Sequence, residues 1–305
     1  MLDSNVRLPE PHRIEAEFGA LPQLPRAVIE MTELDIDSPN FAEEVARIAE
    51  METSIADQVM RIASVQIPLP PEPIDSIPEA VVHMGSRAIS ELTGSLSALS
   101  VFPPITQEHV ELWRHANQVA VIARDIAEDR SIGIDPQAAY LAGLLHDIGR
   151  FLIFEQDPQA LSDSSVRGRP AAPTLIEAER ARFGVEHAEV GAMLCRHWGL
   201  PTAVCDIVRL HHSVVVADEP LLAQVERCLP IIQQADHLSS LLSRERRLLE
   251  LPFSERRALI AAHCMSTYRA AASTPTRLAE RLDIVVGRSR DLLRNLGLGS
   301  SSPVD

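Results

Sequence analysis

The segment LAGLLHDIGR, residues 141 to 150, places two adjacent polar residues, His146 and Asp147, inside an otherwise apolar run. The apolar neighbours predict that both side chains lie on a largely buried helix. A buried charge needs a partner or a metal ion, because the protein interior does not solvate it. Gly143 and Gly149 flank the pair and leave room for the close approach of another element. We therefore expect a polar site at the centre of a helical core.

Helix signals continue on both sides of this segment. Asp135 as the N-cap and Pro136 at the first helical position predict a helix that runs from there to about Phe154. Thr174 and Glu177 form a capping box that predicts another helix start. A long helix is expected where Leu112 to Ala127 form one apolar stripe, and further helices at about 186–197, 201–212, 220–243, 253–271 and 275–296, with Gly184 and Gly199 as helix ends.

The first hundred residues are also expected to be helical. Residues 67–78 carry five prolines, so a helix cannot run through them. Ser76 and Glu79 form a capping box that starts the next helix, and Gly85 interrupts that helix. The remaining helices of this half are expected at about 25–34, from Phe41 onward, at 53–65 and at 86–99.

The composition also favours helices packed on helices. Aromatic residues make up only 4% of the 305 residues, while alanine and the aliphatic residues are abundant. We therefore predict an all-α protein with an N-terminal helical bundle and a C-terminal helical bundle. The expected organisation is a flexible arm (1–20), an N-terminal subdomain (21–105), a metal-binding domain (106–297) and a disordered tail (298–305).

The charge of the chain excludes several classes of function. The net charge is −15, and a field of this sign repels phosphate backbones and anionic lipids, so we expect neither a nucleic-acid partner nor a membrane. A basic cluster at residues 244–247 is interpreted as a solvated helix face. All 28 basic residues are arginine, which excludes Schiff-base chemistry and a P-loop lysine. Metal-assisted hydrolysis needs neither.

The cysteines and the N-terminus indicate a cytoplasmic protein. The four cysteines show no CxxC spacing and are expected to be reduced residues on apolar faces. The first residues contain no apolar segment typical of a signal peptide, and no run of about 18 apolar residues exists.

Further polar residues recur on the inward sides of the predicted helices. Each of them alone is more often a structural residue than a ligand, but several on five helices indicate a shared site. Neutral imidazoles and carboxylates suit one or two divalent transition-metal ions, such as iron, manganese or zinc. The candidates beside His146 and Asp147 are His115, Glu111 one turn before it, His187, His211, His212 and Asp236.

In sequence, the chain resembles the HDOD family, the HD-related output domain proteins of bacteria, over about residues 20–296. The matching stretches are LPQLP (21–25), EEVARIAEMETSIADQVMRIAS (43–64), SIPEAVVHMGSRAISEL (76–92), ELWRHANQVAVIAR (111–124), AAYLAGLLHDIGR (138–150) and FGVEHAEVGAMLCRHWGLP (183–201). This resemblance implies a signalling or regulatory module.

The resemblance to the wider HD superfamily, which contains metal-dependent phosphohydrolases, implies a metal site. The defining ligands of that superfamily fall on His115, His146, Asp147 and Asp236. The HD-GYP branch, which hydrolyses cyclic di-GMP, has additional ligands that fall on His187, His211, His212 and, in some members, Glu111.

The chain departs from these patterns at several positions. The loop after the HH pair is SVVVADEP (213–220), without the Gly-Tyr-Pro sequence of the HD-GYP branch. Arg150 stands where the HD motif usually ends in lysine; it keeps the charge and can bind phosphate, but it is not a general base. In the first half, Glu52-Thr53 and Ala63-Ser64 replace the usual Asp-Pro and Asn-Ser.

Two functions from different classes follow. The first is a regulatory module that acts through a signalling protein partner or by sensing a small ligand. The second is a metal-dependent phosphohydrolase or phosphodiesterase for a phosphorylated small molecule, with Asp147 between the metals and Arg150 or Arg114 stabilising the developing charge. Hydrolysis of cyclic di-GMP is predicted to be weak or absent, because the loop after the HH pair offers valines and acids instead of the recognition sequence.

Overall fold

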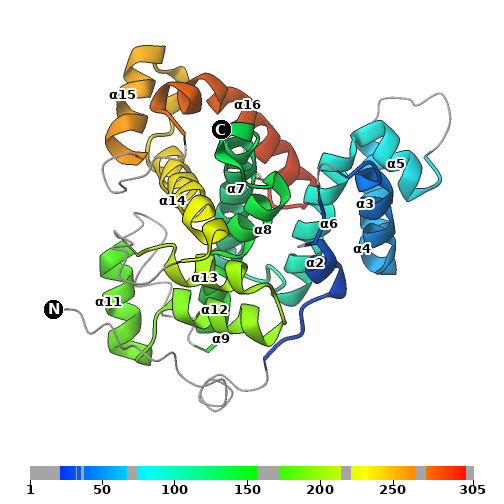
Figure 1. The fold of residues 1–305 in the computed structure, drawn as a ribbon, viewed down its shortest axis with the longest axis horizontal. Helices are drawn as coiled ribbons and strands as arrows, with labels where there is room; N and C mark the ends of the chain where they lie inside the picture. The colour runs from blue at the N-terminus through cyan, green and yellow to red at the C-terminus, as the bar shows by residue number, and fades with distance from the viewer. Residues whose placement is uncertain are drawn as a thin grey trace.

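The computed structural model describes residues 21–31, 33–35, 38–66, 74–156, 172–213, 221–264 and 273–299. Every regular element in these ranges is a helix, which confirms the all-α prediction. Figure 1 shows a larger body formed by the C-terminal helices, with α2 to α6 on one side of it. Within the described ranges, no helix is long and apolar enough to cross a membrane.

The N-terminal part follows the predicted helix signals closely. The Ser76 side chain accepts a hydrogen bond from the Glu79 amide, and Gly85 has a φ of 85° that ends one helix before the next. Most of the proline-containing segment lies outside the described residues. The helices of this part are α2 (Arg26–Met31), α3 (Phe41–Glu50), α4 (Thr53–Gln66), α5 (Ile77–Met84) and α6 (Ser86–Val101).

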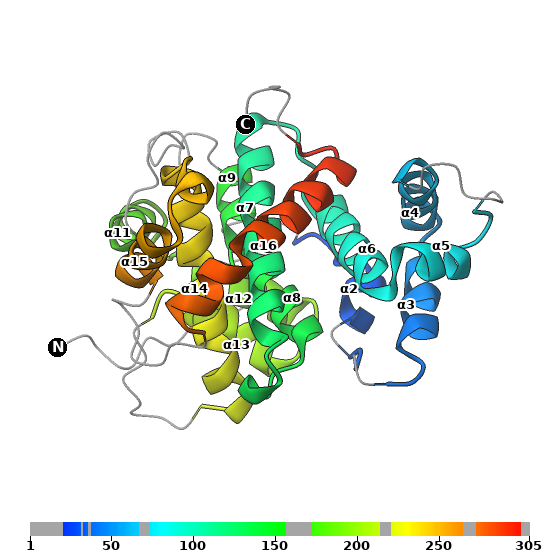
Figure 2. The same ribbon diagram turned by 90° about the horizontal axis from the view of Figure 1, so that it is seen from above.

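The C-terminal part is arranged around the long helix α7 (Gln107–Ala127), which packs against α8, α14 and α16 (Figure 2). Gly184 and Gly199 end helices with positive φ, as predicted. The other helices are α8 (Pro136–Leu145), α9 (Ile148–Gln156), α11 (Ala172–Phe183), α12 (His187–His197), α13 (Thr202–Leu210), α14 (Ala223–Arg244), α15 (Phe253–Cys264) and α16 (Pro275–Asn295). Two short 3₁₀ turns lie at Arg130–Ile132 and Leu248–Glu250.

One predicted helix is wrong in its extent. The helix expected from Pro136 to about Phe154 is interrupted at His146 and Asp147, which form a turn between α8 and α9. The reason is a close helix contact beyond the turn: a Cβ on Gly149 would lie 2.0 Å from the backbone oxygen of His187. The interruption lets α9 pack directly on the start of α12.

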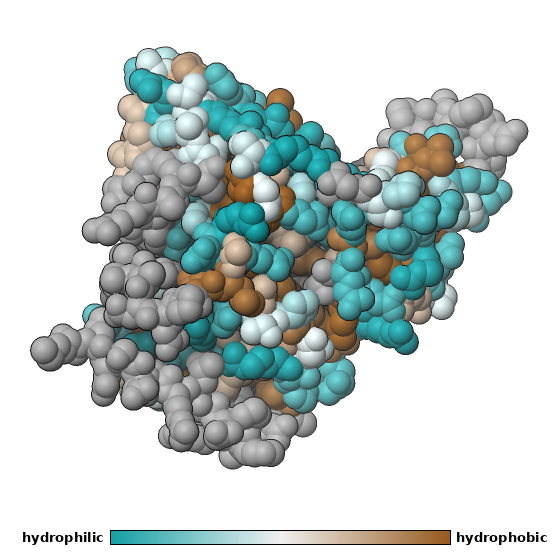
Figure 3. Space-filling view, in the orientation of Figure 1, coloured by the Kyte–Doolittle hydropathy of each residue, from teal (hydrophilic) through white to brown (hydrophobic). Residues whose placement is uncertain are grey.

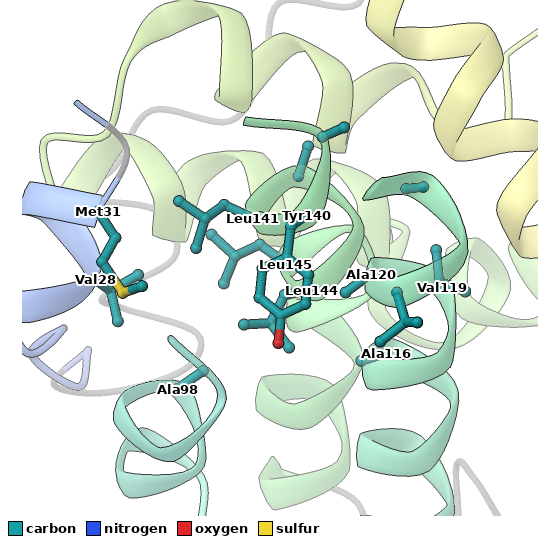
Figure 4. Close-up of a cluster of buried hydrophobic side chains, with 14 of the residues drawn as sticks. Val28, Met31, Ala98, Ala116, Val119, Ala120, Tyr140, Leu141, Leu144 and Leu145 are labelled. Atoms are coloured by element: carbon teal, nitrogen blue, oxygen red, sulfur yellow. The ribbon is translucent and has the colours of Figure 1, made fainter. Parts of the chain in front are cut away.

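Small residues allow α7 and α8 to lie close together. A Cβ on Gly143 would lie only 2.8 Å from the Cα of Ala120, so this position has no room for a larger residue. Figure 4 shows Ala116, Val119 and Ala120 of α7 facing the side chains of α8. The close contact brings the C-terminal end of α8, and with it the His-Asp pair, against α7.

Helix α6 joins the two parts of the chain through buried polar contacts. Ser95 contacts Asn117 of α7 and Tyr140 of α8 at 2.5 and 2.6 Å. Buried polar groups need such partners, so these bonds fix the position of α6 on the C-terminal part. At the other end of the chain, Leu298 is buried and its carbonyl accepts a 2.6 Å hydrogen bond from Arg114. The packed part of the chain therefore extends beyond Gly297, where a disordered tail was expected.

Candidate metal centre

The structure brings together polar residues from five places in the fold. His115 lies on α7, the pair His146 and Asp147 lies between α8 and α9, and His187 begins α12. The remaining members, at the end of α13 and on α14, are His211, His212 and Asp236. They form two groups in which all ligand atoms lie within 4.8 Å of one another: Asp147, His187, His211 and His212 in one, and His115, His146 and Asp236 in the other.

Asp147 lies between the two groups and faces both. Its Oδ1 atom is 3.3 Å from Nε2 of His187 and 3.6 Å from Nε2 of His211. Its Oδ2 atom is 3.8 Å from Nε2 of His115 and 3.6 Å from Nε2 of His146. The two oxygens of one carboxylate are therefore directed at different sets of imidazoles, which is the arrangement needed to bridge two cations.

The second ring nitrogens of these histidines are held by the surrounding protein. Nδ1 of His146 donates to the Gly143 carbonyl at 2.7 Å, and Nδ1 of His211 donates to the Val208 carbonyl at 2.6 Å. Since a carbonyl can only accept, a neutral ring at either position carries its proton on Nδ1 and leaves Nε2 as a lone pair. His115 bonds through Nδ1 to the Ser239 hydroxyl at 2.9 Å.

A carboxylate holds the fourth imidazole. Glu179 of α11 contacts both Nδ1 and the backbone amide of His187, at 2.6 and 2.9 Å. Burial by itself would lower the pKa of His187, but the charge and the hydrogen bond of Glu179, together with the charge of Asp147, raise that pKa above its ordinary value. An imidazole made more basic in this way is a stronger ligand for a cation.

The electrostatics of the centre favour an ionised Asp147 carboxylate beside a neutral His146 ring. Burial alone would raise the pKa of Asp147, but His146 and Arg150 hold it well below its usual range. Burial lowers the pKa of His146, so its ring stays neutral. Arg150 donates to Oδ2 of Asp147 at 3.1 Å and is itself buried.

Two predicted site residues lie away from the groups. Glu111 accepts hydrogen bonds from Gln107 and Arg114 at 2.8 and 2.5 Å. Arg114 also donates to the Leu298 carbonyl, so it connects α7 to the end of the chain. Neither residue belongs to the two groups, whereas Arg150 contacts Asp147 directly. Of the predicted loop at 213–220, residues 214–220 lie outside the described residues.

Glu179 and Ser239 were not among the residues predicted from the sequence. Ser239 also donates to Gln118 at 2.7 Å, which fixes its hydroxyl beside His115. It follows Asp236 by three residues on α14, so helical spacing could have placed it on the same face. Glu179 offered no comparable signal, because its contact with His187 depends on how α11 packs.

The residues present fit a divalent transition-metal centre. Nε2 of His146 and Nε2 of His211 are buried and have no hydrogen-bond partner among the described residues. Leaving a buried acceptor unsatisfied is unfavourable, and coordination of a cation would use both lone pairs. Neutral imidazoles around a shared carboxylate are the donors that first-row transition metals prefer.

Sequence comparisons match parts of this chain to curated proteins. The chain is 28% identical to an uncharacterized protein of Treponema pallidum over 215 residues, which cover 67% of this chain and 40% of the relative. It is 31% identical to ribonuclease Y of Aquifex aeolicus over 111 residues, which cover 36% and 15% respectively. The chain thus matches less than half the length of these curated relatives.

Solved structures show the same fold at low sequence identity. An HDOD domain protein of Geobacter sulfurreducens has a TM-score of 0.64 and 23% identity, covering 93% of this chain and 96% of that one. A candidate phosphohydrolase of Shewanella amazonensis has a TM-score of 0.65 and 20% identity, covering 94% and 97%. A candidate signal transduction protein of Marinobacter aquaeolei has a TM-score of 0.62 and 21% identity, covering 96% and 62%.

The family is shown by the sequence itself. The sequence profile of the HDOD domain matches residues 21–214, which is more than half of the chain and includes six of the seven residues in the two groups. This protein belongs to the HDOD family.

Proposed function

We propose that this chain is a regulatory HDOD module whose C-terminal part binds one or two divalent transition-metal ions and which acts through a signalling protein or a small ligand. The observation that carries the proposal is the position of Asp147, whose two oxygens face two separate groups of imidazoles. The likeness in fold to a candidate signal transduction protein supports the regulatory part.

The residues that would hold metal are the seven members of the two groups. When bound, a divalent cation supplies Lewis acidity and activates water. Around it, Arg150 orients the Asp147 carboxylate and offers a positive charge to an anion. Glu179 and Ser239 hold the rings of His187 and His115 in position. The site also ties together helices that are distant in sequence, which suits a module whose state depends on what is bound.

The cellular compartment and the class of partner are also part of the proposal. All four cysteines are free and buried, which fits a reducing compartment, so we place the protein in the cytoplasm. The net charge of −15 favours a protein partner or a small ligand over a nucleic acid or a membrane surface.

Metal content tests the proposal. Protein purified without a metal-affinity tag is expected to contain iron, manganese or zinc when measured by elemental analysis. Changing both His146 and Asp147 to Ala removes residues from both groups and is expected to abolish that content. Arg247→Ala is a control on an exposed side chain outside the groups. Equal metal content in the double variant and the control would contradict the assignment.

A second candidate function is a metal-dependent phosphohydrolase. Buried Arg150 favours it, because its Nε atom has no hydrogen-bond partner among the described residues while its Nη1 atom contacts Asp147. That free donor would suit a phosphate oxygen. A structural neighbour is a candidate phosphohydrolase, which agrees with this alternative.

Turnover distinguishes the two functions. With manganese or ferrous iron under reducing conditions, we expect cyclic di-GMP hydrolysis far below about one per second, the lower end of ordinary enzyme rates. A generic phosphodiester, bis(p-nitrophenyl) phosphate, is measured in parallel. Turnover of cyclic di-GMP near that rate, lost in Asp147→Ala, would establish an enzyme and contradict the regulatory proposal.

A further inference from the structure

A cleft of about 760 Å³ lies between the C-terminal half of α16 and the helices α4 to α6. Figures 1 and 2 show the end of α16 reaching toward α6, and Figure 3 shows a recess in the outline between the two parts of the molecule. None of the residues that line the cleft belongs to the two groups of the metal centre. Its volume is typical of pockets that bind small molecules.

The cleft gathers positive charge in an acidic protein. Four arginines line the cleft, against two acidic residues, Glu91 and Asp291. The lining is therefore positive, although the whole chain has a net charge of −15. The lining also has an apolar portion, which includes Ile62, Leu92 and Leu292. The arginines come from three helices and lie on both sides of the cleft: Arg61, Arg87, Arg288 and Arg294.

These arginines retain capacity to bind a further anion. Nη2 of Arg87 is buried and has no hydrogen-bond partner among the described residues, although its other nitrogens pair with Glu91 and Glu128. Arg61 is exposed and forms no ion pair with the described part of the chain. Arg288 contacts Asp125 at 3.4 Å from one side of its guanidinium. A buried donor without a partner, beside an open cleft, is available to an acceptor supplied by a ligand.

We propose that this cleft binds a phosphate-bearing small molecule of nucleotide size. Guanidinium groups bind phosphate through paired hydrogen bonds, and the apolar portion of the lining can take the uncharged part of such a ligand. A ligand held by Arg61 and Arg87 on one wall and Arg288 on the other would connect the N-terminal helices to α16. The proposal rests on the ligand-sensing part of the proposed function, and it does not require metal binding.

Calorimetric titration of the full chain, without added divalent metal, tests the proposal with ADP, pyrophosphate and citrate. ADP is expected to bind most tightly and citrate most weakly. Arg61→Glu is expected to weaken ADP binding by about tenfold or more, the loss of one charge-assisted contact, and Arg288→Gln on the opposite wall to weaken it also. Arg257→Glu changes the net charge identically on an exposed face of α15 outside the cleft, and it is expected to leave ADP binding unchanged.

An Asp147→Asn variant, shown to be folded by circular dichroism, separates this site from the metal centre. ADP binding that persists in this variant supports the cleft, whatever the metal content. ADP binding lost in this variant would place the ligand at the metal centre and overturn the proposal. The proposal is also overturned if ADP does not bind to the wild-type chain or if citrate binds as tightly as ADP. Equal effects of Arg61→Glu and Arg257→Glu on ADP binding would overturn it as well.

Discussion

Asp147 determines what the centre can do, because its two oxygens lie within 4 Å of imidazole nitrogens in both groups. Arg150 forms an ion pair with this carboxylate. Nε2 of His146 and Nε2 of His211 are buried and have no hydrogen-bond partner among the described residues. Carbonyl groups hold the far sides of both rings, so the ligand geometry is set before any cation binds.

Glu179 is expected to control metal affinity without touching the metal. Glu179→Gln keeps the size of the side chain but removes the charge that makes His187 more basic. Loss of such a supporting contact typically costs about 10- to 100-fold in metal affinity. Competition with a chromogenic chelator measures this change. Glu177→Gln, on an exposed position of the same helix, is the matched control, and equal affinity in the two variants would show that Glu179 has no such role.

The sequence indicated the ligands better than it indicated their supports. Resemblance to the HD superfamily and its HD-GYP branch assigned all seven residues of the two groups, since those residues occur in recognisable motifs. The same resemblance suggested Glu111, and Arg114 was expected to stabilise developing charge, but their side chains instead pair with each other and with Leu298. The difference is physical: whether a side chain reaches the site depends on the rotation and packing of its helix, which the motif does not specify.

Among the elements, the close contact between α9 and α12 sets the shape of the site. Gly149 meets the backbone of His187, which is 38 residues away in the sequence, so the turn at His146 and Asp147 is stabilised by a distant part of the chain. The local pattern of apolar residues continues through this turn, and it therefore predicted one uninterrupted helix. The helix starts capped by Ser76 and Asp135 were predicted correctly because they depend on neighbouring residues alone, whereas Thr174, predicted as a helix start, lies inside α11.

Gly149→Ala is expected to destabilise the protein by about 1–3 kcal/mol or more, because the added Cβ would overlap the backbone of α12. It should also reduce metal content, since His187 would have to move. Gly287→Ala is the matched control: that glycine lies in α16 with no atom near its Cβ position, so alanine is expected to stabilise by about 0.5–1 kcal/mol. Thermal and denaturant unfolding measure both changes, and similar effects in the two variants would contradict this packing account.

At the scale of the whole molecule, the two predicted parts share one apolar core. Helix α6 is buried from Ile89 to Leu99, although it carries five serine residues. Its Ser95 side chain bonds to Asn117 and Tyr140 instead of facing water. The sequence could predict two helical parts. It could not predict the shared core or the arginine-lined cleft beside α16, because both are formed by segments that are far apart in the chain.

The central claim is that the two groups around Asp147 hold metal. Anomalous X-ray diffraction from crystals of the metal-loaded protein, recorded at the absorption edge of the metal found by elemental analysis, tests it most directly. We predict anomalous density within about 2.0–2.3 Å of Nε2 of His146 or of Nε2 of His211, or of both if two ions bind. Strong anomalous density only elsewhere on the chain, with the two nitrogens uncoordinated, would contradict the account.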